Sequence, residues 1–419
     1  MIFGAIGDDL TGSVELAGML AAGGASVALV TTADAIVQAA SNDTVVVALR
    51  SRVAPVVDAT SAFEAAGRAL LANGARQLFF KYCATFDSTP AGNIGPCTDV
   101  LDGLTGGAGA LFCPTFPEPE RTVYRGHHFV GDQLLSDSPK RDDPLTPMRE
   151  SDLVKVLQPQ TAVRVGLIRL STVQAGSAAI LDEWERLRAV GARYAIVDAL
   201  SHEDLRAIAG ATVDQPLMTG GSSVASHYPA LWREMGWIEA RPARPLRFPP
   251  GPAVVLAGSC ADRTREQIND FGSDHPVLRI DITEGEPDAL VRRATDWVLA
   301  QQGRPACVTT AGDPASVAAV QARLGRDTAA RRAEAVLSGL ARALVGRGFG
   351  RIIVAGGETS GAVVEALGIR ELNVAPFGQP GVGLCVASHP TPLALCLKSG
   401  KLGAPELFRA VLGEMGADA

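Results

Sequence analysis

The opening stretch, residues 1–22, reads MIFGAIGDDLTGSVELAGMLAA and combines a strand, a polar turn and a helix. The apolar run Ile2 to Ile6 predicts a buried strand, and the periodic segment Ser13 to Ala22 predicts a helix that follows it. Asp8 and Asp9 lie between the two. Because parallel strands need crossover connections, repetition of this unit along the chain predicts an α/β fold with a mostly parallel sheet.

The repetition occurs in two series that a proline-rich segment separates. The segment Glu239 to Pro252, EARPARPLRFPPGP, holds five prolines and breaks every hydrophobic period. We therefore predict two domains, residues 1–240 and 253–419, joined by a linker at 241–252, each a mostly parallel sheet flanked by helices, with an active-site cleft between them. The other predicted strands are Ser26 to Val30, Val45 to Leu49, Leu78 to Phe80, Ala110 to Cys113, Val163 to Ile168, Tyr194 to Val197, Ala253 to Ala257, Val277 to Ile282, Cys307 to Thr310, Arg351 to Ala355 and Leu393 to Leu397, and further helices are predicted at Ala175 to Val190 and Asp327 to Val345.

The composition is that of an ordinary globular enzyme. Of the 419 residues 47% are hydrophobic, and 45 are glycine, which suits an α/β protein with many tight turns. The net charge of -7 gives no basic footprint, so nucleic acid and anionic membranes are poor partners. Seven scattered cysteines without a Cys-x-x-Cys pair, and the lack of a leader or an 18-residue apolar run, predict a reduced, cytoplasmic protein.

A polar cluster follows the predicted strand Leu78 to Phe80. Residues 81–96, KYCATFDSTPAGNIGP, combine a cation, a carboxylate and several hydroxyls, a mixture that suits a polyhydroxylated acid at the carboxyl ends of the strands. Lys81 or Arg121 could clamp the carboxylate of such an acid. The other predicted substrate-binding residues are Thr11, Ser88, Thr89 and Asn93.

Three carboxylates are candidates for catalysis. Asp8 and Asp9 could grip hydroxyls, abstract a proton or hold a magnesium ion, and Asp87 is the third candidate base. One of the first two could instead merely cap the helix, whose cap we otherwise expect at Thr11 or Ser13. The sequence does not choose among the three. No set of residues has the spacing of a zinc site, so no protein-bound metal centre is predicted.

The second half carries three glycine-rich turns, each between a predicted strand and a helix. They are AGSCADRTREQI with Ser259, VAGGETSGAVVEAL with Gly356 to Ser360, and LKSGKLGAPELF with Lys398, Ser399 and Gly400. Such turns can bind an anion through backbone N–H groups. The chain has no P-loop sequence and no Gly-x-Gly-x-x-Gly after its first strand, which argues against P-loop enzymes and dinucleotide dehydrogenases.

Five ordered motifs, GDDLTGSVELAG, KYCATFDSTPAGNIGP, CPTFPEPERTVYRG, AGGETSG and LKSGKLG, resemble the four-carbon acid sugar kinase family over essentially the whole chain. The form FDSTPAGNIG is most similar to the branch that phosphorylates 3-oxo-tetronates. The resemblance implies that the N-terminal domain binds the acid and that the C-terminal domain binds ATP. The ATP-binding residues that it implies are Ser259, Gly356, Gly357, Glu358, Thr359 and Gly400.

The expected activity is therefore MgATP-dependent phosphoryl transfer to the terminal O4 hydroxyl of a four-carbon 3-oxo acid. One alternative is a threonate or erythronate kinase of the same family. The other is a non-catalytic sugar-acid sensor with two α/β lobes. The expected partners are ATP and the small acid, and a homodimer is the default assembly.

Overall fold

The computed structural model describes residues 1–143, 145–239, 246–375, 378–379, 381–387 and 392–416. The chain divides into two compact units, Met1–Ala243 and Arg244–Ala419. This division falls inside the predicted linker 241–252, whose residues 241–245 lie outside the described part of the chain. The linker therefore stays a prediction, and each unit is described by itself.

The N-terminal unit is built on the predicted parallel sheet. The strands pair in the order β2-β3-β1-β4-β11-β5-β10-β9, and neighbouring strands run parallel. Their bounds are β1 Phe3–Gly7, β2 Val27–Val30, β3 Thr44–Ala48, β4 Gln77–Lys81, β5 Ala110–Cys113, β9 Val165–Ile168, β10 Tyr194–Val197 and β11 Leu217–Gly220. The strand β11, which our sequence analysis did not include, inserts between β4 and β5.

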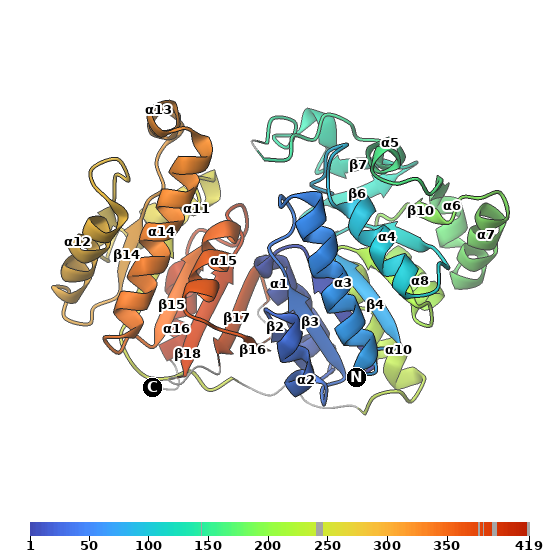
Figure 1. The fold of residues 1–419 in the computed structure, drawn as a ribbon, viewed down its shortest axis with the longest axis horizontal. Coiled ribbons are helices and arrows are strands. Elements are labelled where there is room, and N and C mark those ends of the chain that lie inside the picture. Colours follow the sequence, from blue (N-terminus) through green and yellow to red (C-terminus); the bar gives the residue numbers. More distant parts are fainter. Residues whose placement is uncertain (144, 240–245, 376–377, 380, 388–391, 417–419) are drawn as a thin grey trace. The chain divides into compact units, whose positions relative to one another are not determined.

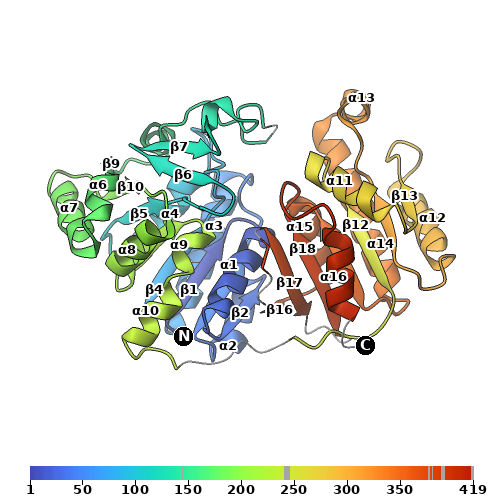
Figure 2. The same ribbon diagram turned by 180° about the vertical axis from the view of Figure 1, so that it is seen from behind.

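Helices cover both faces of this sheet. Figures 1 and 2 show α3 and α4 on one face and α1, α8, α9 and α10 on the other. The helices are α1 Leu10–Ala22, α2 Ile36–Ala39, α3 Val56–Ala72, α4 Ile94–Leu104, α5 Leu153–Leu157, α6 Leu170–Gln174, α7 Ser177–Ala189, α8 His202–Thr212, α9 Ser222–Ala225 and α10 Tyr228–Glu234, with 3-10 turns at Ala33–Ala35, Leu135–Asp137 and Gln158–Gln160.

The central strand β4 shows why both faces must be covered. Its five residues are all buried. On one face Phe80 packs edge-on against Phe63 of α3, with ring centroids 4.6 Å apart, and on the other Phe79 packs against Phe3 at 5.6 Å and Tyr228 of α10 at 6.5 Å. A strand with apolar residues on both faces is stable only between two layers of helices.

A small antiparallel sheet extends the N-terminal unit. It consists of β6 Arg121–Tyr124, β7 His127–Val130 and β8 Gln133–Leu134, and Val123 forms an isolated bridge to Ala199. These strands are not among those predicted from the sequence. The turn between β6 and β7 places Arg125 at φ 53° and Gly126 at φ 76°, a left-handed pair that lets the chain reverse tightly.

The C-terminal unit is a second α/β sheet with one antiparallel edge. Its strand order is β13-β14-β12-β15-β18-β17-β16, in which the first five are parallel and β17 runs antiparallel to both neighbours. The strands are β12 Ala253–Ala257, β13 Val277–Arg279, β14 Ala306–Thr309, β15 Arg351–Ala355, β16 Glu371–Ala375, β17 Val382–Ala387 and β18 Leu393–Lys398, and the helices are α11 Asp262–Phe271, α12 Pro287–Leu299, α13 Pro314–Leu324, α14 Arg326–Val345, α15 Gly357–Ala366 and α16 Leu407–Gly416. α12, α14 and α15 lie on one face, and α11 and α16 on the other (Figures 1 and 2).

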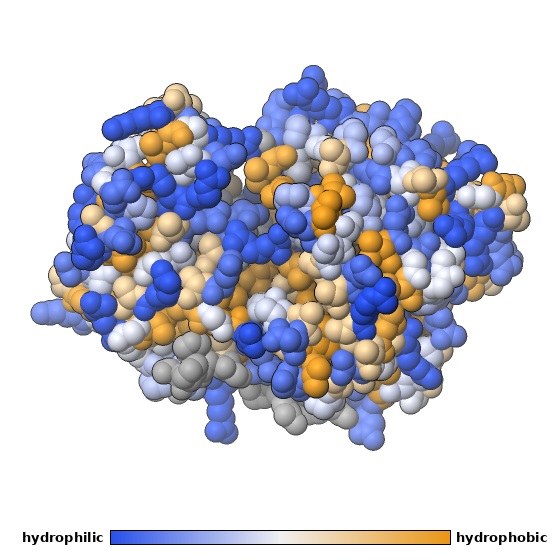
Figure 3. All heavy atoms as spheres, viewed as in Figure 1, coloured by the Kyte–Doolittle hydropathy of each residue, from blue (hydrophilic) through white to orange (hydrophobic). Residues whose placement is uncertain are grey.

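The surface shows both polar and apolar side chains (Figure 3), and the cysteines are unpaired. In the view of Figure 3 hydrophilic side chains are interspersed with small apolar groups. Over the described residues, none of the helices combines the length and the apolar character that crossing a bilayer requires. All seven cysteines are free, and all but Cys83 and Cys260 are buried.

Candidate active site

The register of the N-terminal sheet brings several strand ends to one edge. Gly7 of β1 pairs with Ala48 of β3 and with Lys81 of β4, and Lys81 also pairs with Gly220 of β11. The residues that follow these positions therefore emerge side by side. At such an edge of an open α/β sheet ligands commonly bind.

Asp8 and Asp9 emerge after β1 and share one cation, Arg52, from the loop after β3. The Arg52 guanidinium donates from Nε to Asp8 Oδ2 at 2.9 Å and from Nη2 to Asp8 Oδ1 at 2.7 Å, and Nη2 lies 3.1 Å from Asp9 Oδ1. This forked geometry fixes the orientation of the Asp8 carboxylate. Arg52 was not among the residues predicted from the sequence, because a single arginine in a loop carries no periodic signal.

Asp9 is the cap of helix α1. Its Oδ1 accepts a hydrogen bond from the Gly12 N–H at 2.9 Å, and its Oδ2 accepts one from the Thr11 hydroxyl at 3.1 Å. The expectation that Thr11 or Ser13 caps the helix is therefore wrong: Ser13 donates its hydroxyl to the Asp9 carbonyl at 2.6 Å. An aspartate with extended backbone is a strong N-cap, and Asp9 thus fills the capping role that the sequence left open for one of the two aspartates.

The two neighbouring carboxyls have different pKa values. Burial raises the pKa of Asp8 above its usual value, although Arg52 acts against this. Burial also acts to raise the pKa of Asp9, but the charges of Arg52 and Lys81 and the bonds from Gly12 and Thr11 hold it below the usual value. A general base works best when its pKa lies nearer the working pH, which favours Asp8 over Asp9 for that role.

Replacing Asp9 with alanine is expected to lower the free energy of unfolding by about 0.5–2 kcal/mol, because the α1 N–H groups lose their cap. Asp9→Asn is the matched control, since an asparagine oxygen can still accept from Gly12 while the charge is lost. Urea denaturation of both variants measures the difference. Equal stability of the alanine and asparagine variants would contradict a capping role.

The loop after β4 holds the third carboxylate. Asp87 Oδ1 forms an ion pair with Lys140 at 2.7 Å and accepts from the Thr85 hydroxyl at 2.5 Å. Burial opposes ionisation, but the charges of Lys140 and Arg52 lower the pKa of Asp87 below its usual value. The preceding Phe86 is fully buried at φ 52°, a conformation that bulky residues rarely adopt, so the loop holds Asp87 in one orientation.

Lys81 ends β4 beneath the same edge. It is 3% exposed, and its Nζ donates to the Tyr82 carbonyl at 2.9 Å. A Cβ built on Gly12 would lie 2.8 Å from this Nζ, so glycine is needed there for the ammonium to reach the first turn of α1. A Cβ at the same place would lie 2.5 Å from Asp9 Oδ1, so Lys81 lies close to Asp9, and its charge lowers the pKa of that carboxyl.

The predicted hydroxyl-binding residues Ser88 and Asn93 have internal partners. Ser88 donates to Gln160 Oε1 at 3.0 Å, and Asn93 Nδ2 donates to the carbonyl oxygens of Ser51 and Ala54 at 2.6 and 2.9 Å. The Asn93 bonds hold the loops after β3 and β4 together, and the Ser88 bond joins the loop after β4 to the 3-10 turn Gln158–Gln160. Asn93 Oδ1 is buried without a partner and so keeps the capacity to accept a hydrogen bond.

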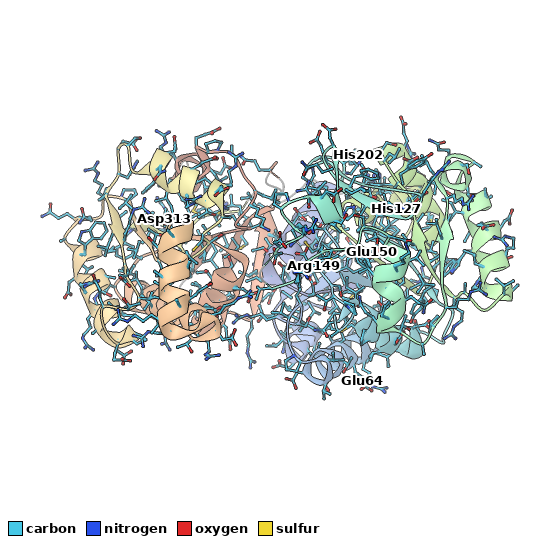
Figure 4. The ribbon with its side chains drawn as sticks, turned by 90° about the horizontal axis from the view of Figure 1, so that it is seen from above. Glu64, His127, Arg149, Glu150, His202 and Asp313 are labelled. Carbon is cyan, nitrogen blue, oxygen red and sulfur yellow. The ribbon has the colours of Figure 1, made fainter. Side chains whose placement is uncertain are left out.

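The small sheet contributes Arg121 and His128. Arg121 is half-buried, donates to the Pro119 carbonyl, and has a pKa that burial lowers. The buried His128 places Nδ1 2.9 Å from the Thr122 carbonyl and Nε2 2.7 Å from the Ala84 carbonyl, so it joins β6 and β7 to the loop of Asp87. The adjacent His127 is partly exposed on β7 and is labelled in Figure 4. Adjacent side chains on a strand point to opposite faces, and the contacts of His128 are structural.

In the C-terminal unit three turns meet at the carboxyl ends of β12, β15 and β18. Ala257 pairs with Ala355, and Ala355 pairs with Lys398, so the turns that follow these strands lie side by side. The Gly356 N–H donates to the Lys398 carbonyl at 3.0 Å. Close packing of these turns requires small residues.

Glycine positions show how closely the turns approach. A Cβ on Gly400 would lie 2.1 Å from Ser259 Oγ, and a Cβ on Gly258 would lie 2.2 Å from Thr359 Oγ1. Gly356, at φ 128°, adopts a conformation that only glycine tolerates, directly before α15. The structure thus brings Ser259, the turn at Gly356 to Thr359, and Gly400 together at one helix N-terminus, an arrangement suited to anions.

Two other polar positions lie near the ends of these strands. Ser360, in the first turn of α15, is buried with no partner for its hydroxyl. Asp313, labelled in Figure 4, caps α13 through the Ser316 N–H at 2.9 Å. This capping contact is sufficient to explain the position of Asp313.

Two family models match successive parts of this chain. Residues 3–228 match a sugar-binding N-terminal domain, and residues 254–408 match a nucleotide-binding C-terminal domain. This chain belongs to the four-carbon acid sugar kinase family. The matches assign sugar binding to the N-terminal domain and nucleotide binding to the C-terminal domain, each as a whole.

Similar proteins span almost the whole chain. A protein of Burkholderia multivorans named 3-oxo-tetronate kinase is 42% identical over 98% of this chain and 96% of its own length. One of Escherichia coli with the same name is 36% identical over 90% of this chain and 98% of its own length. A crystal structure from Salmonella typhimurium LT2, which bears the name of a tRNA synthase, superimposes with a TM-score of 0.86 at 34% identity and covers 98% of both chains. These likenesses confirm the predicted α/β fold.

Proposed function

We propose that this protein is an ATP-dependent kinase that phosphorylates the terminal O4 hydroxyl of a 3-oxo-tetronate. The observation that carries the proposal is the 36–42% identity, over nearly the whole chain, to proteins named 3-oxo-tetronate kinase. The tRNA synthase name of the Salmonella structure finds no support in the motifs of this chain. The predicted branch, inferred from FDSTPAGNIG, agrees with the names of the relatives.

The two sites suit the two substrates. The turns at Ser259, Gly356 and Gly400 would bind the ATP phosphates through backbone N–H groups. The edge at Asp8 would bind the acid, whose carboxylate has Lys81 and Arg121 as candidate partners. Phosphoryl transfer needs mainly alignment and charge stabilisation, so a site that positions one hydroxyl against the γ-phosphate is sufficient.

A magnesium ion would enter with ATP. Among the described residues no group of three acidic, histidine or cysteine side chains could hold a metal ion. Mg²⁺ commonly binds through nucleotide phosphates, water and one or two carboxylates, which does not require such a group. Asp8 and Asp9 are the carboxylates from which we expect such help, and the ion would neutralise charge on the transferred phosphate.

Replacing Gly400 with alanine is expected to weaken ATP binding about tenfold or more, because the new Cβ would collide with Ser259 Oγ. Gly413→Ala is the matched control, since a Cβ there meets nothing within 4 Å. The KM for ATP of each variant measures the effect. An unchanged KM in Gly400→Ala would show that nucleotide binding does not depend on this close approach.

The experiment that tests the proposal is ADP release from MgATP by the purified protein with a panel of acids: 3-oxo-tetronates, 2-oxo-tetronate, threonate and erythronate. Turnover confined to a 3-oxo acid is the expected result. Turnover on threonate or erythronate would keep the kinase and reject the branch. No turnover, with thermal stabilisation by an acid but not by MgATP, would favour the sensor.

A further inference from the structure

Lys398, the last residue of β18, is fully buried beneath the turn that contains Gly400. Its Nζ donates to Gln267 Oε1 at 2.6 Å and to Thr264 Oγ1 at 3.0 Å, both on α11, and lies 3.4 Å from the Gly400 carbonyl. Thr264 donates its hydroxyl to the same carbonyl at 2.8 Å, and Gln267 Nε2 donates to the Ala404 carbonyl at 2.9 Å. One buried cation thus joins helix α11 to this turn.

This cation lacks an anionic partner. In the described part of the chain no carboxylate lies within ion-pair distance of Lys398, and the paired strands place Ala355 and Val382 opposite it. The ionisable groups that act on it are Cys396 on β18 and Arg263 on α11. Burial lowers the pKa of Lys398 to about 7; a Cys396 thiolate would raise it, and Arg263 lowers it further. An unpaired buried charge of this kind is unfavourable in the free protein.

We propose that Lys398 is the positioning residue of the nucleotide site and that the phosphates of a bound nucleotide supply the negative charge that it lacks in the free protein. The proposal rests on nucleotide binding at the turns of the proposed function. Lys398 and Thr264 hold the Gly400 carbonyl from beneath, while the Cα of Gly400 faces Ser259. Lys398 therefore acts through the turn, and its charge acts on the phosphates through a dry interior where attraction is strong.

Binding should consequently take up a proton. In the free protein the group is mostly neutral above pH 7. Nearby phosphate charge favours the ammonium form, so the pKa of Lys398 rises in the complex and the complex holds more protons than its separate components. The nucleotide affinity should fall as the pH rises above 7, because the protonation of Lys398 that accompanies binding becomes less favourable at a lower proton concentration.

The test is calorimetric titration of the full-length protein with ADP at pH 8.0, in two buffers of different ionisation enthalpy, for the native protein and Lys398→Met. ADP is already ionised at this pH, so the protons that are taken up on binding are bound by the protein. We expect proton uptake in the native protein, its loss in Lys398→Met, and about tenfold weaker binding in that variant. The control is Arg347→Met, an exposed cation that follows α14 at the opposite edge of the sheet, and it should behave as the native protein does.

Equal ADP affinity and equal proton uptake in Lys398→Met and the native protein would overturn the inference. If Lys398→Met does not fold, the titration of the native protein is sufficient as a test. Absence of proton uptake on ADP binding between pH 7.5 and 9 would then refute the role of Lys398. Failure of the native protein to bind ADP at any pH would instead refute the proposed function, which keeps the two outcomes distinct.

Discussion

Replacing Asp8 with asparagine is expected to lower kcat by about 10²- to 10⁴-fold while the KM for the acid changes little. Asp8 is 5% exposed and is held in one orientation by the forked contact with Arg52. Each carboxylate oxygen accepts one bond from Arg52 and so keeps a second lone pair for the hydroxyl proton. Asparagine keeps the shape of the side chain but cannot accept that proton at neutral pH.

The same substitution at Asp87 and Asp9 provides the comparison. We expect Asp87→Asn mainly to raise the KM for the acid, because Asp87 is paired with Lys140 and has a lowered pKa. We expect Asp9→Asn to lower kcat less than Asp8→Asn, because Asp9 is occupied as the cap of α1. Small and equal losses in all three variants would contradict the assignment of any of them as the base.

The pH dependence of kcat gives a second test of Asp8. A base must be deprotonated to act, so kcat should rise with pH as Asp8 ionises and then level off. Since burial raises the pKa of Asp8, this rise should lie above the usual range of an aspartate. The remaining activity of Asp8→Asn should lack that acid limb. If Asp8→Asn showed the same fall of kcat at low pH, a group other than Asp8 would be responsible for it.

Replacing Arg52 with methionine is expected to lower the free energy of unfolding by about 3–5 kcal/mol at neutral pH. Arg52 is the shared partner of Asp8 and Asp9, whose side chains are 6% and 19% exposed, and its loss leaves both charges without this partner in a mostly dry site. Lys81 would remain as the neighbouring cation. Denaturant titration measures the effect.

The loss of stability in Arg52→Met should become smaller as the pH falls. Without Arg52 the pKa values of Asp8 and Asp9 rise, so the folded variant binds protons that the unfolded chain does not bind. The loss of stability should therefore shrink as the pH falls through these raised pKa values. The control is Arg68→Met, which removes an exposed pair with Glu64 on α3 and should cost at most about 0.5 kcal/mol. A similar cost for both variants would contradict the role of Arg52.

Many of the strands could be predicted because a short run of neighbouring residues is sufficient to identify each one. The strands β1, β5, β10, β12 and β15 are short apolar runs bounded by turn residues, and the predicted ranges lie within one residue of those observed. The strand β11 was not predicted; it pairs with β4 and β5, which are far away along the chain. The strands β16 and β17 were not predicted either, although they pair with neighbouring segments of the chain. The small sheet β6-β7-β8 was not predicted, because its strands are short and turns with glycine separate them.

The candidate site could be predicted in position and only partly in detail. Strand order and register dictate that Asp8 and Lys81 emerge at one edge, and glycine-rich turns mark Ser259 and Gly400. Side-chain partners, by contrast, depend on tertiary contacts. Arg52 has no pattern around it, and the hydroxyl of Ser88 is taken by Gln160, which is 72 residues away along the chain.

The measurement that tests the central claim most directly is the structure of the product formed from MgATP and a 3-oxo-tetronate. We expect one phosphate per molecule of acid, with its phosphorus coupled to the two C4 protons in NMR spectra and one ADP released per phosphate transferred. ATP hydrolysis without phosphorylated acid, or a phosphate on another oxygen, would contradict transfer to O4. Absence of any ATP consumption with every four-carbon acid would contradict the assignment of a kinase.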